Sequence, residues 1–477
     1  MNGKLYIGGK FCEAADGATF DVVNPYNLKK IGEQAAATKA DVVRAIDFAE
    51  TGFASLKALT AHRRADLLRK LYAAMLANEK EIAETMTEEQ GKPLKEAIGE
   101  VRYAASYVQW YAEEGIRVQG DILAPSSSKM RLHVLREPVG PVALITPWNF
   151  PLAMMVRKLA PAIAAGCSVI AKPAGQTPFT AVKFFQLIDQ VGFPEGSCQL
   201  LTGSAELIGE VLLDDFRIRK LSFTGSTEVG KRLAQKSAAT LKRVSMELGG
   251  HAPLIIFSDA DIKKAVKGAV LSKYLNSGQA CIASNRLYVH TAIKADFVAA
   301  LTESVRGLKV GNGMENADIG PVIDQNAYQK IALHVDDACA KGGKVLTGGQ
   351  GYRAIDGAGG YLYPATLLDD VDDQMLIVNE ETFGPVLPIL TFEDDDDVIR
   401  RANATPYGLA AYAYTESLTR ATKVMESLEF GMIGINTPGL GAVQTPFGGV
   451  KMSGYGREGG KYGIEEYLQT KIVNIGL

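Results

Sequence analysis

The stretch "VALITPWNFPLAMMVRKLAPAIAAGCSVIAK", residues 142–172, joins two short apolar runs through a segment whose apolar residues recur at helical spacing. The runs "VALIT" (142–146) and "SVIAK" (168–172) are typical of buried strands. The segment between them is long enough for a helix that crosses from one strand to the next. The stretch therefore predicts a βαβ unit with parallel strands.

Further runs of the same kind continue this alternation toward the carboxyl terminus. The next strand candidates are "CQLLTG" (198–203), "KLSFTG" (220–225), "RVSMEL" (243–248) and "PLIIF" (253–257). A second series comprises "RLYVH" (286–290), "KVLTGG" (344–349), "PVLPILTF" (385–392) and "MIGIN" (432–436). Strands that alternate with helices form parallel sheets, so we predict an α/β protein with two lobes.

Other segments lie outside this alternation. The runs "KLYIGG" (4–9) and "TFDVVNP" (19–25) predict a short hairpin, and two stretches at helical spacing follow it. The segments "MRLHVLREPVG" (130–140) and "EYLQTKIVNIGL" (466–477) resemble strands that would expose unpaired edges. Pairing between subunits is one way to cover such edges.

Composition bounds the function. A chain of 477 residues with 47% hydrophobic composition is expected to form two or three domains. The net charge of −3, without a cluster of basic residues, makes nucleic acid and anionic membranes unlikely partners. Five cysteines without CxxC spacing predict neither a disulfide framework nor a metal site. Since no stretch has the form of a signal peptide, we expect a cytoplasmic protein.

Three turns carry residues that can do chemistry. "FTGSTEVG" (223–230) follows a strand and opens a helix, where free N–H groups suit a pyrophosphate. Its spacing is not GxGxxG, and an ordinary strand-to-helix turn is the alternative. Asn149 in "TPWNFP" follows a strand and can hold an oxyanion or merely satisfy its own turn. Glu247 ends a strand before two glycines and is either a general base or a carboxylate that faces a loop.

Cys281 lies in "LNSGQACIASN" (275–285), among small and polar residues. It follows a Ser-Gly-Gln turn and precedes a run that can begin a helix, a position that lowers the pKa of a thiol. Cys167 and Cys198 adjoin strands instead, as buried apolar thiols do. Cys281 is therefore the candidate nucleophile.

Taken together, these stretches resemble the aldehyde dehydrogenase superfamily along nearly the whole chain. Further matches are "KPAGQTP" (172–178), "EETFGPV" (380–386) and "PFGGVKMSGYGREGG" (446–460). The resemblance implies a Rossmann-like cofactor domain, an α/β catalytic domain and a β oligomerisation flap. It assigns residues 1–119 and 139–250 to the NAD(P)-binding domain, 251–450 to the catalytic domain, and 120–138 and 460–477 to oligomerisation, as a homodimer or homotetramer.

The resemblance also implies a mechanism. Cys281 would attack the aldehyde carbon, and the Asn149 amide with the Cys281 N–H would hold the oxyanion of the thiohemiacetal. Loss of hydride to the nicotinamide would leave a thioester. Glu247 would then activate water to hydrolyse it. A nucleotide-binding or structural member without activity is the alternative, but such a protein is expected to lack Cys281 or Glu247.

The same resemblance assigns cofactor contacts. The residues that it matches to NAD or NADP are Trp148, Lys172, Gly175, Gly225, Ser226, Glu381 and Phe383. Many members that prefer NAD carry a glutamate where this chain has Gly175. Because that carboxylate would repel a 2′-phosphate, its absence admits NADP.

Arg157 is the candidate substrate-binding residue. It lies two helical turns beyond Asn149 and can face the same tunnel, or it is a solvated helix residue. Similarity to succinate-semialdehyde and lactaldehyde dehydrogenases, which also have this arginine, implies a small aldehyde that bears a carboxylate, such as succinate semialdehyde. Lactaldehyde, glycolaldehyde and another short or aromatic aldehyde are the alternatives. Leu275 stands where some succinate-semialdehyde dehydrogenases have a second arginine.

Overall fold

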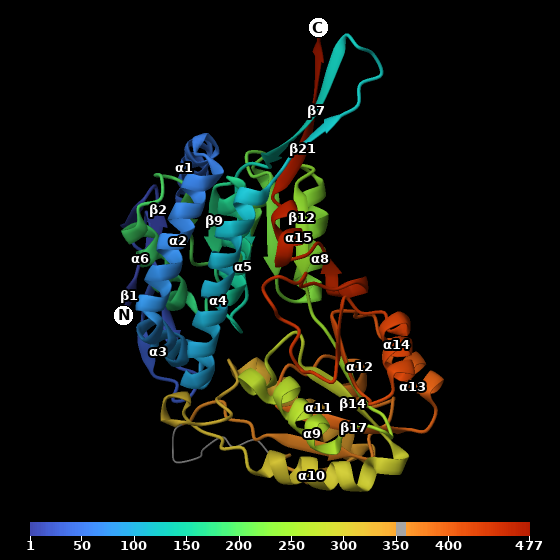
Figure 1. Ribbon diagram of the computed structural model, residues 1–477. Coiled ribbons are helices and arrows are strands. Elements are labelled where there is room, and N and C mark those ends of the chain that lie inside the picture. The colour runs from blue at the N-terminus through green and yellow to red at the C-terminus, as the bar shows by residue number, and fades with distance from the viewer. Residues whose placement is uncertain (350–358) are drawn as a thin grey trace.

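The βαβ unit predicted from residues 142–172 is present in the computed structural model, which describes residues 1–349 and 359–477. It consists of β8 (Val142–Ile145), α5 (Ala153–Ala165) and β9 (Val169–Lys172), and the two strands pair in parallel. All of α5 is buried, because the helix is apolar apart from Arg157 and Lys158 and packs against both the sheet and neighbouring helices. The unit forms the centre of the first lobe (Figure 1).

The first sheet has eight strands in the order β20-β12-β11-β8-β9-β10-β2-β3. Besides β8 and β9 it contains β2 (Leu5–Ile7), β3 (Lys10–Cys12), β10 (Cys198–Leu200), β11 (Lys220–Thr224), β12 (Arg243–Glu247) and β20 (Gly454–Tyr455). The five central strands are parallel, and the chain order reverses between β8 and β11. In such a sheet, ligands bind outside the carboxyl ends of the strands at this switch point.

The second sheet has seven strands in the order β15-β16-β17-β14-β13-β18-β19. The strands are β13 (Ala252–Ile256), β14 (Ser284–His290), β15 (Lys344–Thr347), β16 (Thr366–Asp369), β17 (Val386–Phe392), β18 (Ala410–Tyr414) and β19 (Met432–Ile435). The strand predicted at 253–257 belongs to this second lobe, and β16 and β18 were not predicted. The edge strand β15 runs antiparallel, whereas the other pairs are parallel.

The predicted amino-terminal hairpin is wrong. β2 pairs antiparallel with β3, because Gly8 and Gly9 both adopt positive φ and close a tight turn directly after β2. The second run, β4 (Thr19–Val23), instead pairs with β5 (Lys30–Ala35), and β1 (Asn2–Gly3) completes a separate sheet of three strands.

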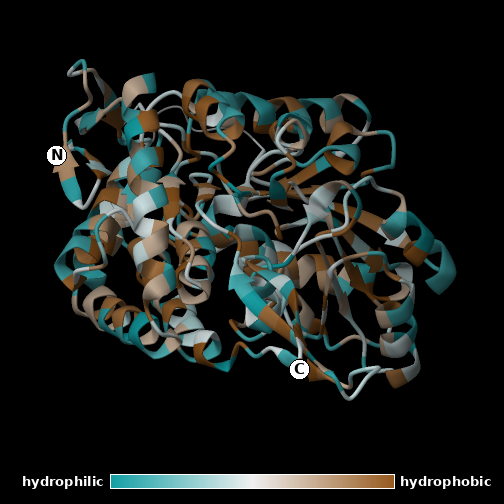
Figure 2. Ribbon diagram, turned by 90° about the horizontal axis from the view of Figure 1, so that it is seen from above, coloured by the Kyte–Doolittle hydropathy of each residue, from teal (hydrophilic) through white to brown (hydrophobic). Residues whose placement is uncertain are grey.

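The helices cover the faces of the two large sheets. The first lobe contains α1 (Lys39–Ala58), α2 (Ala61–Ala77), α3 (Glu79–Gln90), α4 (Leu94–Glu114), α6 (Pro178–Val191), α7 (Ala205–Asp214), α8 (Thr227–Ala238) and α15 (Gly460–Glu465). The second contains α9 (Ile262–Tyr274), α10 (Lys294–Arg306), α11 (Gln325–Ala340), α12 (Leu376–Asn379), α13 (Asp395–Asn403) and α14 (Leu418–Ser427). Many of them carry both apolar and polar residues (Figure 2). Among the described residues, every helix is too short or too polar to cross a bilayer.

The two segments predicted as unpaired strands lie together in a flap that projects from the body (Figure 1). β7 (Met130–Pro138) pairs along its whole length with β21 (Leu468–Gly476), and β6 (Asp121–Leu123) pairs on the other side of β7. Each segment therefore covers one edge of the other within the chain. In the described residues, β21 still has an open outer edge.

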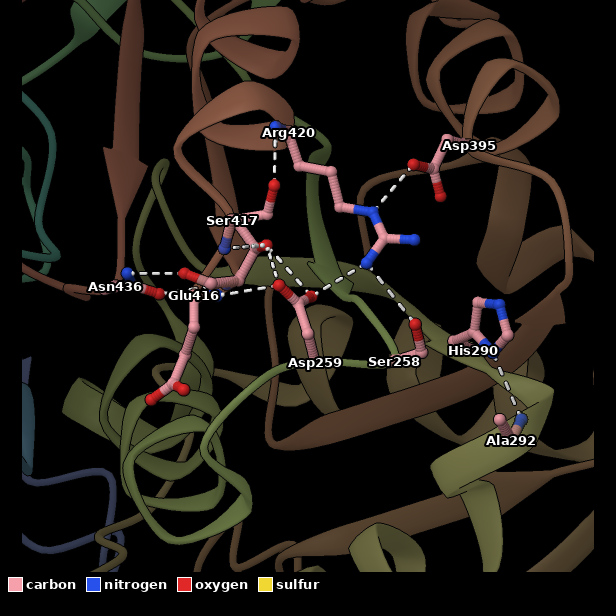
Figure 3. A network of polar contacts seen from close by, with 10 residues as sticks. Ser258, Asp259, His290, Ala292, Asp395, Glu416, Ser417, Arg420 and Asn436 are labelled. Carbon is pink, nitrogen blue, oxygen red and sulfur yellow. Dashed lines mark hydrogen bonds and ion pairs between the residues drawn. The ribbon is translucent and has the colours of Figure 1, made fainter.

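A polar network closes the carboxyl edge of the second sheet (Figure 3). Asp259 accepts hydrogen bonds from Thr415 Oγ1 and from the backbone N–H of Glu416, and it pairs with Arg420 at 3.0 Å. Arg420 also donates to Asp395, and Asn436 bonds the backbone of Thr415. These charges and amides therefore pair mainly with one another.

The two lobes meet where β12 ends and β13 begins. The chain leaves the first sheet after Glu247 and enters the second at Ala252. It returns to pair β20 antiparallel with β12, with Gly454 opposite Glu247. The carboxyl ends of the first sheet therefore face the amino ends of the second.

Candidate active site

A cleft of about 560 Å³ lies between the lobes. It is lined by all the residues predicted for catalysis and for cofactor binding: Trp148, Asn149, Lys172, Gly175, Gly225, Ser226, Glu247, Cys281, Glu381 and Phe383. These residues come from segments up to 235 positions apart in the chain, from Trp148 to Phe383. The cleft opens at the switch point between β8 and β11, as the order of the strands requires.

Asn149 and Ser226 stand at the two strand ends that form the switch point. Asn149 follows β8 and is 5% exposed, and its side-chain Nδ2 donates to the carbonyl of Gln279 at 3.1 Å. Ser226 is the N-cap of α8, where its Oγ accepts the backbone N–H of Val229. The helix predicted after the glycine turn is therefore present, and its amino terminus points its N–H groups at the cleft.

Cys281 lies in the loop between α9 and β14. The turn before it is unusual, because Asn276, Ser277 and Gly278 all have positive φ, of 52°, 56° and 74°. The helix that we predicted after Cys281 is absent, since β14 begins at Ser284. Left-handed backbone at three successive residues turns the chain sharply just before Cys281. The thiol is half-buried there.

The thiol of Cys281 is not activated by a helix amino terminus. Burial, reinforced by the neighbouring Glu247 carboxylate, raises its pKa well above the usual value of a cysteine, and Arg157 opposes this rise. The lowered pKa that we predicted for Cys281 is therefore wrong. A base beside the thiol, rather than a dipole, has to remove its proton.

Glu247 is the base within reach. It ends β12, is 3% exposed, and neither carboxylate oxygen has a hydrogen-bond partner among the described residues. Burial raises its pKa above the usual range, whereas Arg157 and Lys158 lower it. A Cβ at Gly250 would stand 2.3 Å from the carbonyl oxygen of Cys281, so this glycine lets the segments of Glu247 and Cys281 approach each other.

The residues predicted to hold the nicotinamide side of a cofactor lie on one loop after α12. Glu381 accepts the backbone N–H of Gly250 at 3.0 Å, and burial raises its pKa to about 7. Phe383 packs edge to face on Trp148, with the ring centroids 5.6 Å apart. Lys330, which we did not predict, donates to the Glu381 carbonyl at 2.5 Å and also lines the cleft.

The other end of the cleft fits a dinucleotide. Thr146 and Thr224 follow and end the two switch-point strands, and both hydroxyls are buried without a partner among the described residues. Lys172 is buried beside them, which lowers its pKa to about 8. Around Gly175 there is open space, since a Cβ there would meet only Phe20, at 3.9 Å. Free hydroxyl and ammonium donors can bond the ribose and phosphates of a dinucleotide, and the open space at Gly175 leaves room for them.

The environment of Arg157 differs from both predictions, which placed it in the substrate tunnel or in solvent. It is 2% exposed rather than solvated, and it is not among the residues that line the cleft. Its Nε donates to Glu458 at 2.8 Å, and its guanidinium lies 3.9 Å above the ring of Phe447. Lys158 pairs with the other oxygen of Glu458. A direct grip on the substrate therefore competes with an existing ion pair.

Glu458 was quoted within a matched motif, but its role as a partner of two cations was not predicted. Although burial opposes ionisation, Lys158 and Arg157 lower its pKa to about 2. Two cations thus share one carboxylate beside Glu247, and the cluster has a surplus of positive charge. Glu458 lies 301 positions from Arg157 and 300 positions from Lys158 in the sequence, so local spacing cannot reveal these pairs.

Within residues 1–349 and 359–477, no three His, Cys, Asp or Glu side chains converge as ligands for a metal ion. The five cysteines are free thiols.

Comparisons with known proteins identify the family of this chain. The family model "Aldehyde dehydrogenase family" matches residues 11–473. A 3-sulfolactaldehyde dehydrogenase of Pseudomonas putida is 46% identical over 99% of this chain and 97% of its own. A succinate-semialdehyde dehydrogenase [NADP(+)] of Escherichia coli is also 46% identical, over the same shares. The crystal structure of an aldehyde dehydrogenase from Brucella melitensis biovar abortus superposes with a TM-score of 0.97 at 47% identity, over 99% and 97% of the chains.

Proposed function

Since this chain belongs to the aldehyde dehydrogenase family, we propose that its cleft oxidises a small aldehyde to the carboxylic acid through Cys281. Enzymes of this family depend on NAD or NADP, and so does this one. The observation that carries the proposal is the meeting of Cys281, Glu247 and Asn149 on one cleft with the candidate cofactor residues.

We assign the steps as follows. Glu247 takes the proton of the Cys281 thiol, and the sulfur attacks the aldehyde carbon to form a thiohemiacetal. The Asn149 amide and the Cys281 backbone N–H bind the negative oxygen. The bound nicotinamide supplies the hydride acceptor, and Cys281 is left as a thioester. Once the thiol proton has passed to solvent, the Glu247 carboxylate deprotonates a water molecule that attacks the thioester. The proton then passes from Glu247 to the departing sulfur, which frees the carboxylic acid and the Cys281 thiol.

The cofactor would lie along the first sheet. Ser226 and the N–H groups near Gly225 suit the pyrophosphate, and Lys172 suits the adenosine ribose. Glu381 and Phe383 suit the nicotinamide ribose and ring, beside Trp148.

For the substrate we propose an aldehyde that bears a carboxylate, with succinate semialdehyde as the first choice. The surplus positive charge of Arg157, Lys158 and Glu458 beside the catalytic pair favours an anion. The names of similar enzymes also point to anionic aldehydes. A panel of aldehydes with each cofactor, followed by absorbance of the reduced nicotinamide, tests this. Preference for long-chain or aromatic aldehydes would refute the substrate class.

Replacing Arg157 with Leu tests the proposed specificity. We expect kcat/KM for succinate semialdehyde to fall about tenfold more than kcat/KM for propanal. A charged hydrogen bond contributes about 1.5–3 kcal/mol. The effect should lie at the lower end of this range, because Glu458 already bonds the guanidinium. Arg157→Lys, which keeps the charge, should retain most of the preference. An equal loss for both aldehydes would show that Arg157 only supports the fold.

We propose that the cleft accepts NADP, because Gly175 leaves open space where a carboxylate would repel a 2′-phosphate. Gly175→Glu is expected to weaken NADP by about 1–3 kcal/mol more than NAD, through like charges that are partly screened. Titration of protein fluorescence with each cofactor measures the difference. Gly175→Gln, equal in size but neutral, is the control and should leave the ratio nearly unchanged. Equal weakening by Glu and Gln would argue against this geometry.

We also propose that the flap joins subunits into a homodimer or homotetramer. Exposed apolar side chains cluster on its strands, at Ile122, Leu123, Leu135, Ile472 and Ile475. The open edge of β21 can pair with another chain. The domain boundaries and the cytoplasmic location derived from the sequence stay predictions.

A further inference from the structure

A row of charged residues at the start of α4 points toward the catalytic loops. Glu96 and Glu100 are spaced four apart on one face of α4, and Lys92, two residues before the helix, bonds Glu100 on that face. Neither α4 nor these residues line the cleft itself. Each of the three nevertheless bonds a loop that carries one of the proposed oxyanion donors.

Lys92 and Glu100 hold the loop of Asn149. Lys92 Nζ donates to the backbone carbonyl of Asn149 at 2.7 Å and to Glu100 Oε2 at 2.6 Å. The other oxygen of Glu100 accepts the backbone N–H groups of Leu152 and Ala153, at 3.0 Å each, where α5 begins. The carbonyl and the following turn are thus fixed from one side by a single ion pair.

Glu96 holds the loop of Cys281. Its Oε2 accepts the backbone N–H of Asn276 at 2.8 Å, at the residue whose φ of 52° is costly for a side chain other than glycine. Asn276 Nδ2 in turn donates to the carbonyls of Asn149, at 2.8 Å, and of Gln279, at 3.1 Å. The two catalytic loops are therefore bonded both to α4 and to each other.

The burial of the ion pair needs an explanation. Lys92 and Glu100 are 1% and 4% exposed, and the desolvation of two charges commonly cancels their attraction. A pair of apolar residues would stabilise the fold as well. Charged groups, however, bond a carbonyl and two N–H groups in the interior through shorter and stronger hydrogen bonds than neutral groups do.

We propose that Lys92, Glu96 and Glu100 are positioning residues that set the oxyanion site by fixing the Asn149 and Cys281 loops against α4. This inference rests on the proposed function, because it presumes that Asn149 and the Cys281 N–H bind the oxyanion. The three side chains do not line the cleft in which substrate and cofactor are proposed to bind. They act through the backbone of the loops.

Lys92→Met is the first test. We expect the rate of reduced cofactor formation in the first turnover to fall about tenfold to a hundredfold, because small displacements of catalytic donors have effects of that size. The Kd for the cofactor should not change, since its proposed contacts lie on other elements. The matched control is Lys220→Met, which removes a lysine that is equally buried and pairs with Ser245 and Glu466. The control should lower the melting temperature without lowering this rate.

A double-mutant cycle with Asn149→Ala separates positioning from stability. If Lys92 acts through the Asn149 amide, Lys92→Met should slow the Asn149→Ala enzyme less than threefold, whereas a purely structural effect would add in full. Full additivity, or an unchanged rate in the single variant, would overturn the inference while leaving the role of Asn149 intact. An Asn149→Ala enzyme as fast as the unaltered one would instead refute the proposed oxyanion site.

Glu100→Gln serves if Lys92→Met fails to fold. Its amide oxygen can still accept from α5, but the charge that orients Lys92 is lost. Its control is Glu89→Gln, because Glu89 accepts the N–H groups of Phe179 and Thr180 at the start of α6 in the same manner. A slower first turnover in Glu100→Gln alone supports the inference, and equal rates in the two variants contradict it.

Discussion

Aldehyde oxidation is expected to fall by roughly four orders of magnitude or more in Cys281→Ala, because no other group in the described cleft can form the thiohemiacetal. Cofactor affinity should remain, since the proposed contacts lie on α8 and on the loop after α12. Steady-state assays and a fluorescence titration of the same preparation measure the two quantities.

The exposed thiol of Cys339 provides the matched control. Cys339→Ala removes a free cysteine from the far end of α11 and should leave turnover unchanged. Appreciable turnover in Cys281→Ala would rule out the covalent mechanism. Loss of both activity and cofactor binding would point to a misfolded cleft, which the melting curve of the variant would reveal.

Glu247→Gln should stop the reaction at the thioester. The expected time course is a burst of about one reduced cofactor per site, followed by turnover that is about 10²- to 10⁴-fold slower, the contribution of a general base. Because Glu247 also serves as the base for the thiol, the burst itself should be slower than in the unaltered enzyme. Stopped-flow absorbance resolves the two phases.

The pH dependence gives an independent check on Glu247. Burial raises the pKa of its carboxyl group, and only the carboxylate accepts a proton, so turnover should increase as the pH rises through that raised pKa. Glu247→Gln should lose this rise. Hydroxylamine, which attacks thioesters without a base, should restore release of the acyl group. Steady turnover at the original rate would remove Glu247 from the mechanism.

Local sequence patterns predicted much of the fold where the signal itself is local. Short apolar runs at regular intervals identified the parallel strands of the first sheet, from β8 to β12. The amino-terminal hairpin was wrong because the two-glycine turn at Gly8 and Gly9 determines pairing more strongly than the next apolar run. β16 and β18 were missed, as short runs without a distinct pattern.

The predicted catalytic and cofactor residues line one cleft because they stand at strand ends and at turns. Asn149, Ser226 and Glu247 each follow or end a strand, and parallel strands bring these ends to one edge. The environment of Arg157 was not predictable in the same way. Its partner Glu458 comes from a distant part of the chain, so neither its burial nor its ion pair leaves a local pattern.

The pairing of β20 with β12 makes the second lobe an excursion within the first. Residues 252–435 leave and return at neighbouring points, and Gly454 lies opposite Glu247. During synthesis, Glu247 and Cys281 therefore emerge from the ribosome well before β20, which closes the edge of the first sheet. The cleft acquires its final shape only after residue 454 and the Cys281 lobe have both emerged. A truncated product that ends before residue 454 would leave the edge of β12 open to misassociation.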